Sequence, residues 1–217
     1  MSAPPWVVRA ILVVFGLAGW FFTQARLARR SPPEGRIGDR ILEWTEPLNR
    51  FFWEHPATAN ALLVATSALV DLLGIFLVVL GIFGGSFRPL LGLGILFALR
   101  QACQSLCALP APERMIWRDP GFPSLLVTYG TSTDLFFSGH TAIAVYGCLE
   151  LARVGGTAGA IAGAAIAVLE AATVLVLRAH YTMDVFAGAV TALWVYGAAA
   201  ALAPPVDAWL MHLVRAA

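Results

Sequence analysis

The sequence has no lysine, few charged residues of either sign and only three cysteines. Charged side chains make up 12% of its 217 residues, against about a quarter in soluble domains, which excludes an ordinary soluble protein. Three cysteines make no disulfide framework. All fourteen basic residues are arginine, so any phosphate held by a basic side chain is held by a guanidinium, which can contact two oxygens at once.

Long apolar runs take the place of the missing charge. The chain is 59% hydrophobic, with a mean hydropathy of +0.77, and runs of this length are typical of membrane helices. The amphipathic stretch RILEWTEPLNRFFWEH predicts an interfacial helix. We therefore predict one all-α membrane domain over residues 1–217, a six-transmembrane-helix bundle with an interfacial helix between spans 1 and 2 and a catalytic core at about 88–203. The predicted spans are 6–24, 58–84, 88–109, 138–153, 157–177 and 181–203.

Two short polar stretches, DLFFSGHTA and RAHYTMDVFAG, interrupt the apolar pattern. Six spans would place both on one membrane face. His180 and Asp184 are four residues apart at a predicted helix start, so they share a face. An aspartate that accepts the N–H of one imidazole nitrogen frees the other nitrogen as a nucleophile or base. The alternative is a His–Asp pair that only satisfies itself near the lipid head groups.

The first stretch has the features of an anion-binding helix start. Ser138 and Gly139 precede backbone N–H groups that lack partners, which attract phosphate, and glycine allows a ligand to approach closely. His140 then lies in the first turn, where it could donate a proton. The alternative is Ser138 as a simple N-cap beside an interfacial histidine.

Together, the two stretches supply the groups for phosphoryl transfer through a phosphohistidine, with one histidine attacking and the other acting as the acid. His140, His180 and Asp184 would make only a thin ligand set for a metal. We expect no metal and no other cofactor.

SGHT and HYTMD resemble the paired motifs of the type-2 phosphatidic acid phosphatase superfamily. The closer similarity is to its head-group transferase branch, which contains the sphingomyelin synthases and the plant phosphatidylcholine:diacylglycerol cholinephosphotransferases. It spans about residues 100–188 and implies a six-helix core that needs no metal. It also implies His180 as the nucleophile, Asp184 as its partner, and His140 as acid and then base.

Further residues match this branch. Asp134 lies six positions before His140, Tyr181 belongs to the H-Y-T-x-D-V motif, and Arg100 precedes the Leu-Pro pair at 109–110. The phosphatase branch fits less well, because its usual lysine is absent, Phe137 replaces a proline and Val174 replaces an arginine. Arg178 is the predicted substitute for the missing cations. The predicted substrate and phosphate-binding residues are therefore Ser138, Gly139, Arg178, Arg100, Asp134 and Tyr181.

Asp71, Arg100 and Glu170 lie deep within predicted spans. Such residues usually face the bundle interior and pair, so Arg100 is expected to bind Asp71 or Glu170. A polar wall of the head-group chamber is the alternative. A carboxylate near aromatic rings could also hold a quaternary ammonium.

The predicted activity is a lipid head-group phosphotransferase that moves a phosphocholine-like group from a phospholipid to a lipid alcohol, diacylglycerol or ceramide. A lipid phosphatase that uses water is the first alternative, and a noncatalytic membrane scaffold or transporter is the second. We expect a multi-pass protein of a bacterial cytoplasmic membrane, with lipid and not nucleic acid as its partner. Nine arginines on the site's face favour a cytoplasmic site, whereas sphingomyelin synthases carry theirs on the other side, so the side and the oligomeric state stay open.

Overall fold

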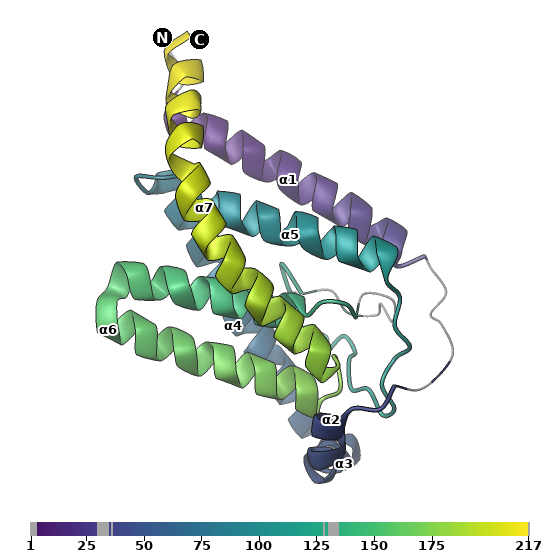
Figure 1. The fold of residues 1–217 in the computed structure, drawn as a ribbon. Helices are drawn as coiled ribbons and strands as arrows, with labels where there is room; N and C mark the ends of the chain where they lie inside the picture. The colour runs from purple at the N-terminus through teal and green to yellow at the C-terminus, as the bar shows by residue number, and fades with distance from the viewer. Residues whose placement is uncertain (1–3, 30–34, 36, 128, 130–134, 217) are drawn as a thin grey trace.

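The computed structural model describes residues 4–29, 35, 37–127, 129 and 135–216, and over these ranges it contains seven helices and no strand (Figure 1). The all-α prediction is confirmed. The helices are α1 Pro5–Leu27, α2 Arg40–Trp44, α3 Glu46–Glu54, α4 Pro56–Phe83, α5 Arg88–Leu106, α6 Gly139–Val176 and α7 Thr182–Ala216.

Four of these helices are long and apolar enough to cross a membrane, namely Pro5–Arg26, Pro56–Phe83, Gly139–Val176 and Thr182–Leu213. The chain is therefore a multi-pass membrane protein by composition. The α6 segment is a hairpin and not one straight helix, because Gly156 has φ 56° and ψ −141°, a conformation that glycine adopts without strain. Its two arms run side by side in opposite directions (Figure 1). They coincide with the predicted spans 138–153 and 157–177.

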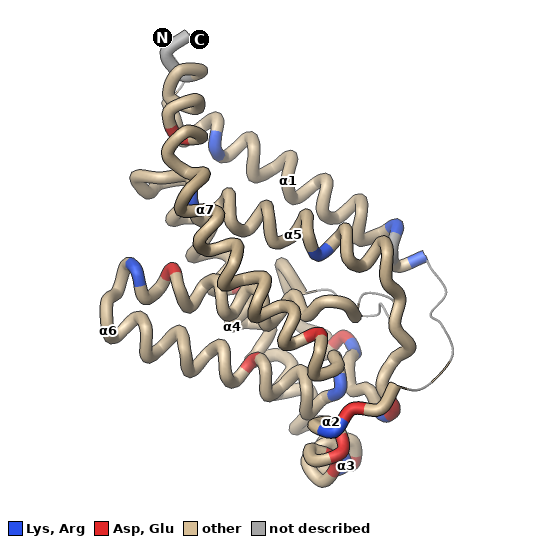
Figure 2. Tube along the Cα trace, viewed as in Figure 1, with Lys and Arg blue, Asp and Glu red and all other residues tan. Residues whose placement is uncertain are grey.

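Residues 40–54, expected to form one interfacial helix, fold instead as the short helices α2 and α3, which meet at Thr45. The Asp39 side chain caps α2 by accepting hydrogen bonds from the N–H groups of Ile41 (3.0 Å) and Leu42 (3.3 Å). Charged residues gather around these two helices, whereas the long helices carry isolated ones (Figure 2). The pair lies at the end of the bundle where α7 begins (Figure 1).

The core lies where α4, α5, α6 and α7 meet. Buried aliphatic side chains of α4, α5 and α6 form one apolar cluster with Tyr146 and two residues of α7, Ala192 and Val195. Helices in a membrane associate through close van der Waals packing and not through burial from water, so the interlocking side chains of this cluster fix the relative positions of the four helices. The packing of these helices against one another also holds the starts of α6 and α7 next to each other.

An ion pair joins α1 and α7 at the end of the bundle opposite to α2 and α3. Arg9 of α1 contacts Asp207 of α7 at 3.3 Å and donates to the carbonyl of Gly84 at 2.9 Å. Asp207 also accepts hydrogen bonds from Ser86 and from the N–H of Phe87. The last predicted span was expected to end at 203, before two prolines. The α7 helix instead continues past both prolines, and Asp207 anchors this extension to α1 and to the turn between α4 and α5.

Candidate active site

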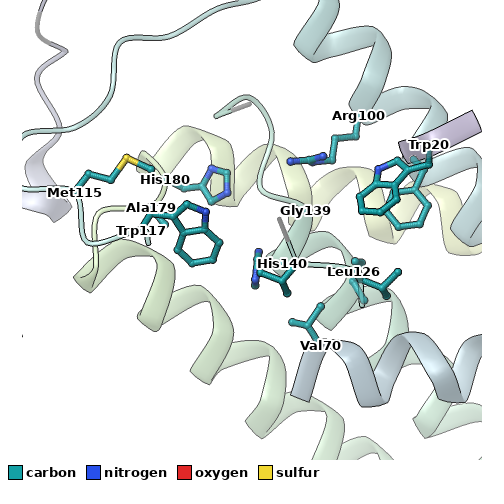
Figure 3. Close-up of a pocket in the computed structure, with 13 residues that line it drawn as sticks. Trp20, Val70, Arg100, Met115, Trp117, Leu126, Gly139, His140, Ala179 and His180 are labelled. Atoms are coloured by element: carbon teal, nitrogen blue, oxygen red, sulfur yellow. The ribbon is translucent and has the colours of Figure 1, made fainter. Parts of the chain in front are cut away.

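The two polar stretches meet where α6 and α7 begin. The N–H of Ser138 donates to the carbonyl of Asp184 at 3.0 Å. A Cβ at Gly188 would lie only 2.6 Å from the Ser138 carbonyl oxygen, so glycine permits this close approach. As a result, His140 and His180 line one cavity (Figure 3).

His180 lies on the turn between α6 and α7, and its ring orientation is fixed by the backbone. Its Nδ1 is 2.8 Å from the carbonyl oxygen of Leu135 and 3.5 Å from Oδ2 of Asp184. A carbonyl only accepts hydrogen bonds, so Nδ1 carries the hydrogen and donates it. The lone pair of the neutral ring is then on Nε2. The Leu135 carbonyl therefore helps to orient the His180 ring, a role predicted for Asp184 alone. A backbone contact of this kind is not visible in a side-chain motif.

Asp184 is completely buried. Its Oδ2 accepts a hydrogen bond from the N–H of Tyr181 at 2.9 Å, which holds the carboxylate beside His180. At 3.5 Å from the ring, this carboxylate would stabilise a positive charge that develops on the imidazole. Its position fits the predicted partnership with His180.

His140 lies in the first turn of α6, with its ring edge-on to Trp117 at a centroid distance of 4.9 Å. Ser138 caps the helix, since its hydroxyl accepts from the N–H of Thr141 at 3.3 Å and from the Thr141 hydroxyl at 3.0 Å. Nε2 of His140 is buried and has no hydrogen-bond partner among the described residues. A buried nitrogen without a partner is costly, so this atom is available to a ligand in the cavity.

Arg100 of α5 lies against the start of α6. A Cβ at Gly139 would come within 2.9 Å of the Arg100 Nε, so the glycine leaves the space that the guanidinium occupies. One terminal nitrogen of Arg100 lies 3.4 Å from Oε1 of Gln24. Arg100 and Gly139 line the same cavity as the two histidines (Figure 3). A cation and the helix start are thus next to both histidines.

Arg178 lies outside this cavity. Its guanidinium donates to the carbonyls of Glu113 (2.8 Å) and Leu42 (3.2 Å) and forms an ion pair with Glu46. The left-handed backbone of Arg178, with φ 56°, belongs to the tight turn that precedes His180. Arg178, the predicted replacement cation, therefore links α2 and α3 to the turn that precedes His180.

Two other predicted residues have different placements. Tyr181 is buried, and its hydroxyl donates to the carbonyl of Pro110 at 3.0 Å, so it holds the segment after α5 beside the site. Asp134 lies outside the described residues.

The charges deep within the predicted spans do not pair as expected. The carboxylate of Asp71 accepts hydrogen bonds from the N–H groups of Leu125 and Leu126, both at 2.8 Å. Glu170 is fully buried, and neither of its oxygens has a hydrogen-bond partner within the described chain. The predicted Arg100–Glu170 pair is wrong, because neither Glu170 oxygen is bonded to any described residue. Asp71 holds the segment that carries Leu126 to the cavity wall.

The segment between α5 and α6 supplies cavity walls that the sequence did not predict. Met115, Trp117, Leu126 and Val127 all line the cavity, and the N–H of Ile116 donates to the carbonyl of Leu177 at 2.8 Å. This proline-rich segment has no helical or strand periodicity, so its inward-facing residues carried no signal. Within the described ranges, no three histidine, cysteine or carboxylate side chains are grouped so that they could hold a metal ion.

Two carboxylates outside the membrane helices stabilise this end of the protein. Asp39 accepts hydrogen bonds from the N–H (2.6 Å) and the hydroxyl (2.7 Å) of Thr182. Burial alone would raise the pKa of Asp39, but the hydrogen bonds from Thr182, Leu42 and Ile41 together outweigh it and lower that pKa. Burial would also raise the pKa of Glu46, but Arg178, Arg114 and Arg50 together outweigh it and lower that pKa. Both carboxylates are therefore held in the charged form.

Comparison with known proteins identifies one family. No curated protein and no solved structure matches the chain. A family model described as AtPDCT1/2 matches residues 39–201 of the 217, a range that includes α2 to α6, both polar stretches and most of α7. The chain belongs to the AtPDCT1/2 family, that of the phosphatidylcholine:diacylglycerol cholinephosphotransferase of Arabidopsis.

Proposed function

We propose that the protein is a cholinephosphotransferase of the sphingomyelin synthase-like type, which moves phosphocholine from phosphatidylcholine to a diacylglycerol. The observation that carries the proposal is the ring of His180, whose Nδ1–H is bound to the Leu135 carbonyl and whose other nitrogen is free to attack in a cavity shared with His140. Membership of the AtPDCT1/2 family supports phosphocholine as the transferred group.

In the first half-reaction, Nε2 of His180 attacks the phosphorus of the donor lipid. The bond from phosphorus to the diacylglycerol oxygen breaks, and protonated His140 gives its proton to that oxygen. Phosphocholine is then bound to His180 as a phosphoimidazolium. The Leu135 carbonyl and the carboxylate of Asp184 stabilise the positive ring through Nδ1.

In the second half-reaction, the hydroxyl of an acceptor diacylglycerol loses its proton to His140 and attacks the same phosphorus. The phosphorus–nitrogen bond breaks, and His180 returns to its neutral form. His140 regains the proton that it lost, so protons balance over the cycle. Arg100 and the N–H groups at the start of α6 would stabilise the negative charge on the transferring phosphoryl oxygens, because these groups adjoin both histidines.

The proposed topology has six crossings, made by α1, α4, α5, the two arms of α6, and α7. In this topology, α2, α3 and the cavity lie at the same face of the membrane. The turn between α4 and α5 and the tip of the α6 hairpin then lie on the other face. The arms of α6 support this arrangement because each matches one predicted span.

The test is a transfer assay in liposomes that contain phosphatidylcholine labelled in the head group and an unlabelled diacylglycerol of different chain length. Label in the new phosphatidylcholine supports transfer, whereas label released into water supports hydrolysis. We expect the His180→Ala variant to lose transfer completely, because it lacks the nitrogen to which phosphocholine is bound in the proposed mechanism. Transfer at the wild-type rate in that variant would exclude the phosphohistidine mechanism.

A further inference from the structure

The cavity that holds the two histidines is too small for a whole lipid. Its volume is about 30 Å³, which leaves room for only a few atoms. Most of a lipid substrate must therefore lie in an adjoining space. A second cavity of about 630 Å³ lies between α1 and α5, within the range of about 300 to 1,000 Å³ typical of ligand-binding sites.

The two cavities share a wall. Trp20 of α1 and Phe97 of α5 line both of them, and their rings pack at a centroid distance of 5.3 Å. Just beyond this pair, the side-chain amide of Gln101 donates to Gln24 at 3.0 Å. We call the space between α1 and α5 the α1–α5 groove. Its end at Trp20 and Phe97 is next to Arg100 and the histidines.

The lining of the α1–α5 groove changes along its length. Among the described residues that line it, the polar groups are those of Thr23 and Gln101 and the indole N–H of Trp20, all at the end near the histidines, and the others are apolar or glycine. The groove therefore has the polarity of a lipid, with a polar end at the reacting group and an apolar remainder.

The length of the groove also fits an acyl chain. The helices α1 and α5 run side by side in the same direction (Figure 1), and the groove extends along α1 from Leu12 to Thr23. At 1.5 Å per residue this is about 16 Å. The hydrocarbon core of a bilayer is about 30 Å thick, so one leaflet has about half that depth.

We propose that the α1–α5 groove binds an acyl chain of the lipid substrate and so places the glycerol end of that lipid at His180. The inference rests on the proposed function, because it assigns a chain-binding site to the same reaction. Gly16 and Gly94 line the groove, and a Cβ at either would meet no atom within 4 Å. A larger side chain at these positions would fill the space meant for the chain.

The experiment compares the Gly16→Leu/Gly94→Leu double variant with Gly197→Leu. Gly197 is an exposed helical glycine of α7 with open space around it, and it does not line the groove. Leucine favours helix over glycine, so both variants should fold. Transfer is measured with dioleoyl and with dihexanoyl lipids. The ratio of the long-chain rate to the short-chain rate should fall at least tenfold in the double variant and stay at the wild-type value in Gly197→Leu.

Varying the chain length of the donor alone and then of the acceptor alone shows which lipid occupies the groove, and a change for either supports the proposal. A wild-type ratio in the double variant, or an equal fall in Gly197→Leu, overturns it. A phosphatidylcholine with a photoreactive diazirine in its acyl chain gives a readout independent of activity. Cross-links to α1 or α5 should form in the wild type and decrease in the double variant.

The two proposals fail in different ways. If the wild type transfers no phosphocholine with either chain length, the proposed function is wrong, and the cross-links still decide whether the groove binds a lipid chain. If the wild type transfers phosphocholine but cross-links on α1 and α5 are absent or unaffected by the double variant, only the groove assignment is wrong.

Discussion

The two arginines nearest to the polar stretches have different surroundings and should have different functions. Arg100 lines the cavity beside both histidines, whereas Arg178 is bound to carbonyls and to Glu46. The Arg100→Gln variant should lower kcat about a hundredfold, because it removes a donor to the transferring phosphate, and should lower the Tm less than a change at Arg178 does. Arg178→Gln should instead lower the Tm. Rates and thermal melts of the two purified variants check this, and the opposite assignment of effects would restore Arg178 as the phosphate ligand.

Glu170 is a buried acidic side chain that does not line the cavity of the two histidines. Its carboxylate is fully buried and neither oxygen has a partner in the described chain. Since Glu170→Gln replaces a buried acidic side chain with a neutral one of the same shape and breaks no described hydrogen bond, we expect the Tm to stay the same or rise. Transfer should stay within a few-fold of the wild-type rate. A normal Tm together with a loss of transfer would show that Glu170 acts on the substrate.

Two carboxylates hold α2 and α3 against the start of α7 and the residues that precede it. Asp39 binds Thr182, and Glu46 binds Arg178 and Arg114. The ordinary pKa values of these groups are 3.8 and 4.5, and both are lowered in the folded protein. The folded state therefore binds protons more weakly than the unfolded state.

It follows that the stabilisation by these two groups is complete at neutral pH and is lost as the pH falls through and below their ordinary pKa values. Melts from pH 7 down to about pH 3 in detergent should show a falling Tm in the wild type and a smaller fall in Glu46→Gln. The variant should already be less stable at pH 7, because Arg178 then lacks its carboxylate. Parallel Tm curves for the two proteins would contradict the assignment.

The helices and the chemical motifs were predictable because both have local patterns. Apolar runs predicted α1, α4, α5, α7 and the two arms of α6, and the spacing of His180 and Asp184 predicted their shared face. The cavity walls were not predictable, because Trp117 and Leu126 lie in a segment without periodicity. The role of Leu135 is a backbone carbonyl contact, which no residue type encodes. The direction of the Arg178 side chain depends on a left-handed turn that the sequence stretch does not indicate.

For the whole molecule, the proposed mechanism needs both polar stretches on one membrane face, which follows from six crossings. Four of the described helices are long and apolar enough to cross a membrane. One of them, α6, reverses its direction at Gly156, so its two arms could cross separately. Two topologies are thus distinguishable. In the six-crossing topology, the turn at Gly85 and the tip of the hairpin at Gly155 lie on the face opposite to α3.

Single-cysteine labelling decides between these topologies. In a background that lacks Cys103, Cys107 and Cys148, cysteine is introduced at one of three exposed positions, Glu54, Gly85 or Gly155. A membrane-impermeant maleimide should label Glu54→Cys from one side of sealed vesicles and both Gly85→Cys and Gly155→Cys from the other side only. The first arm of the α6 hairpin separates its tip from His140. Labelling of Gly155→Cys from the same side as Glu54→Cys would therefore mean that the arms of α6 do not cross the membrane.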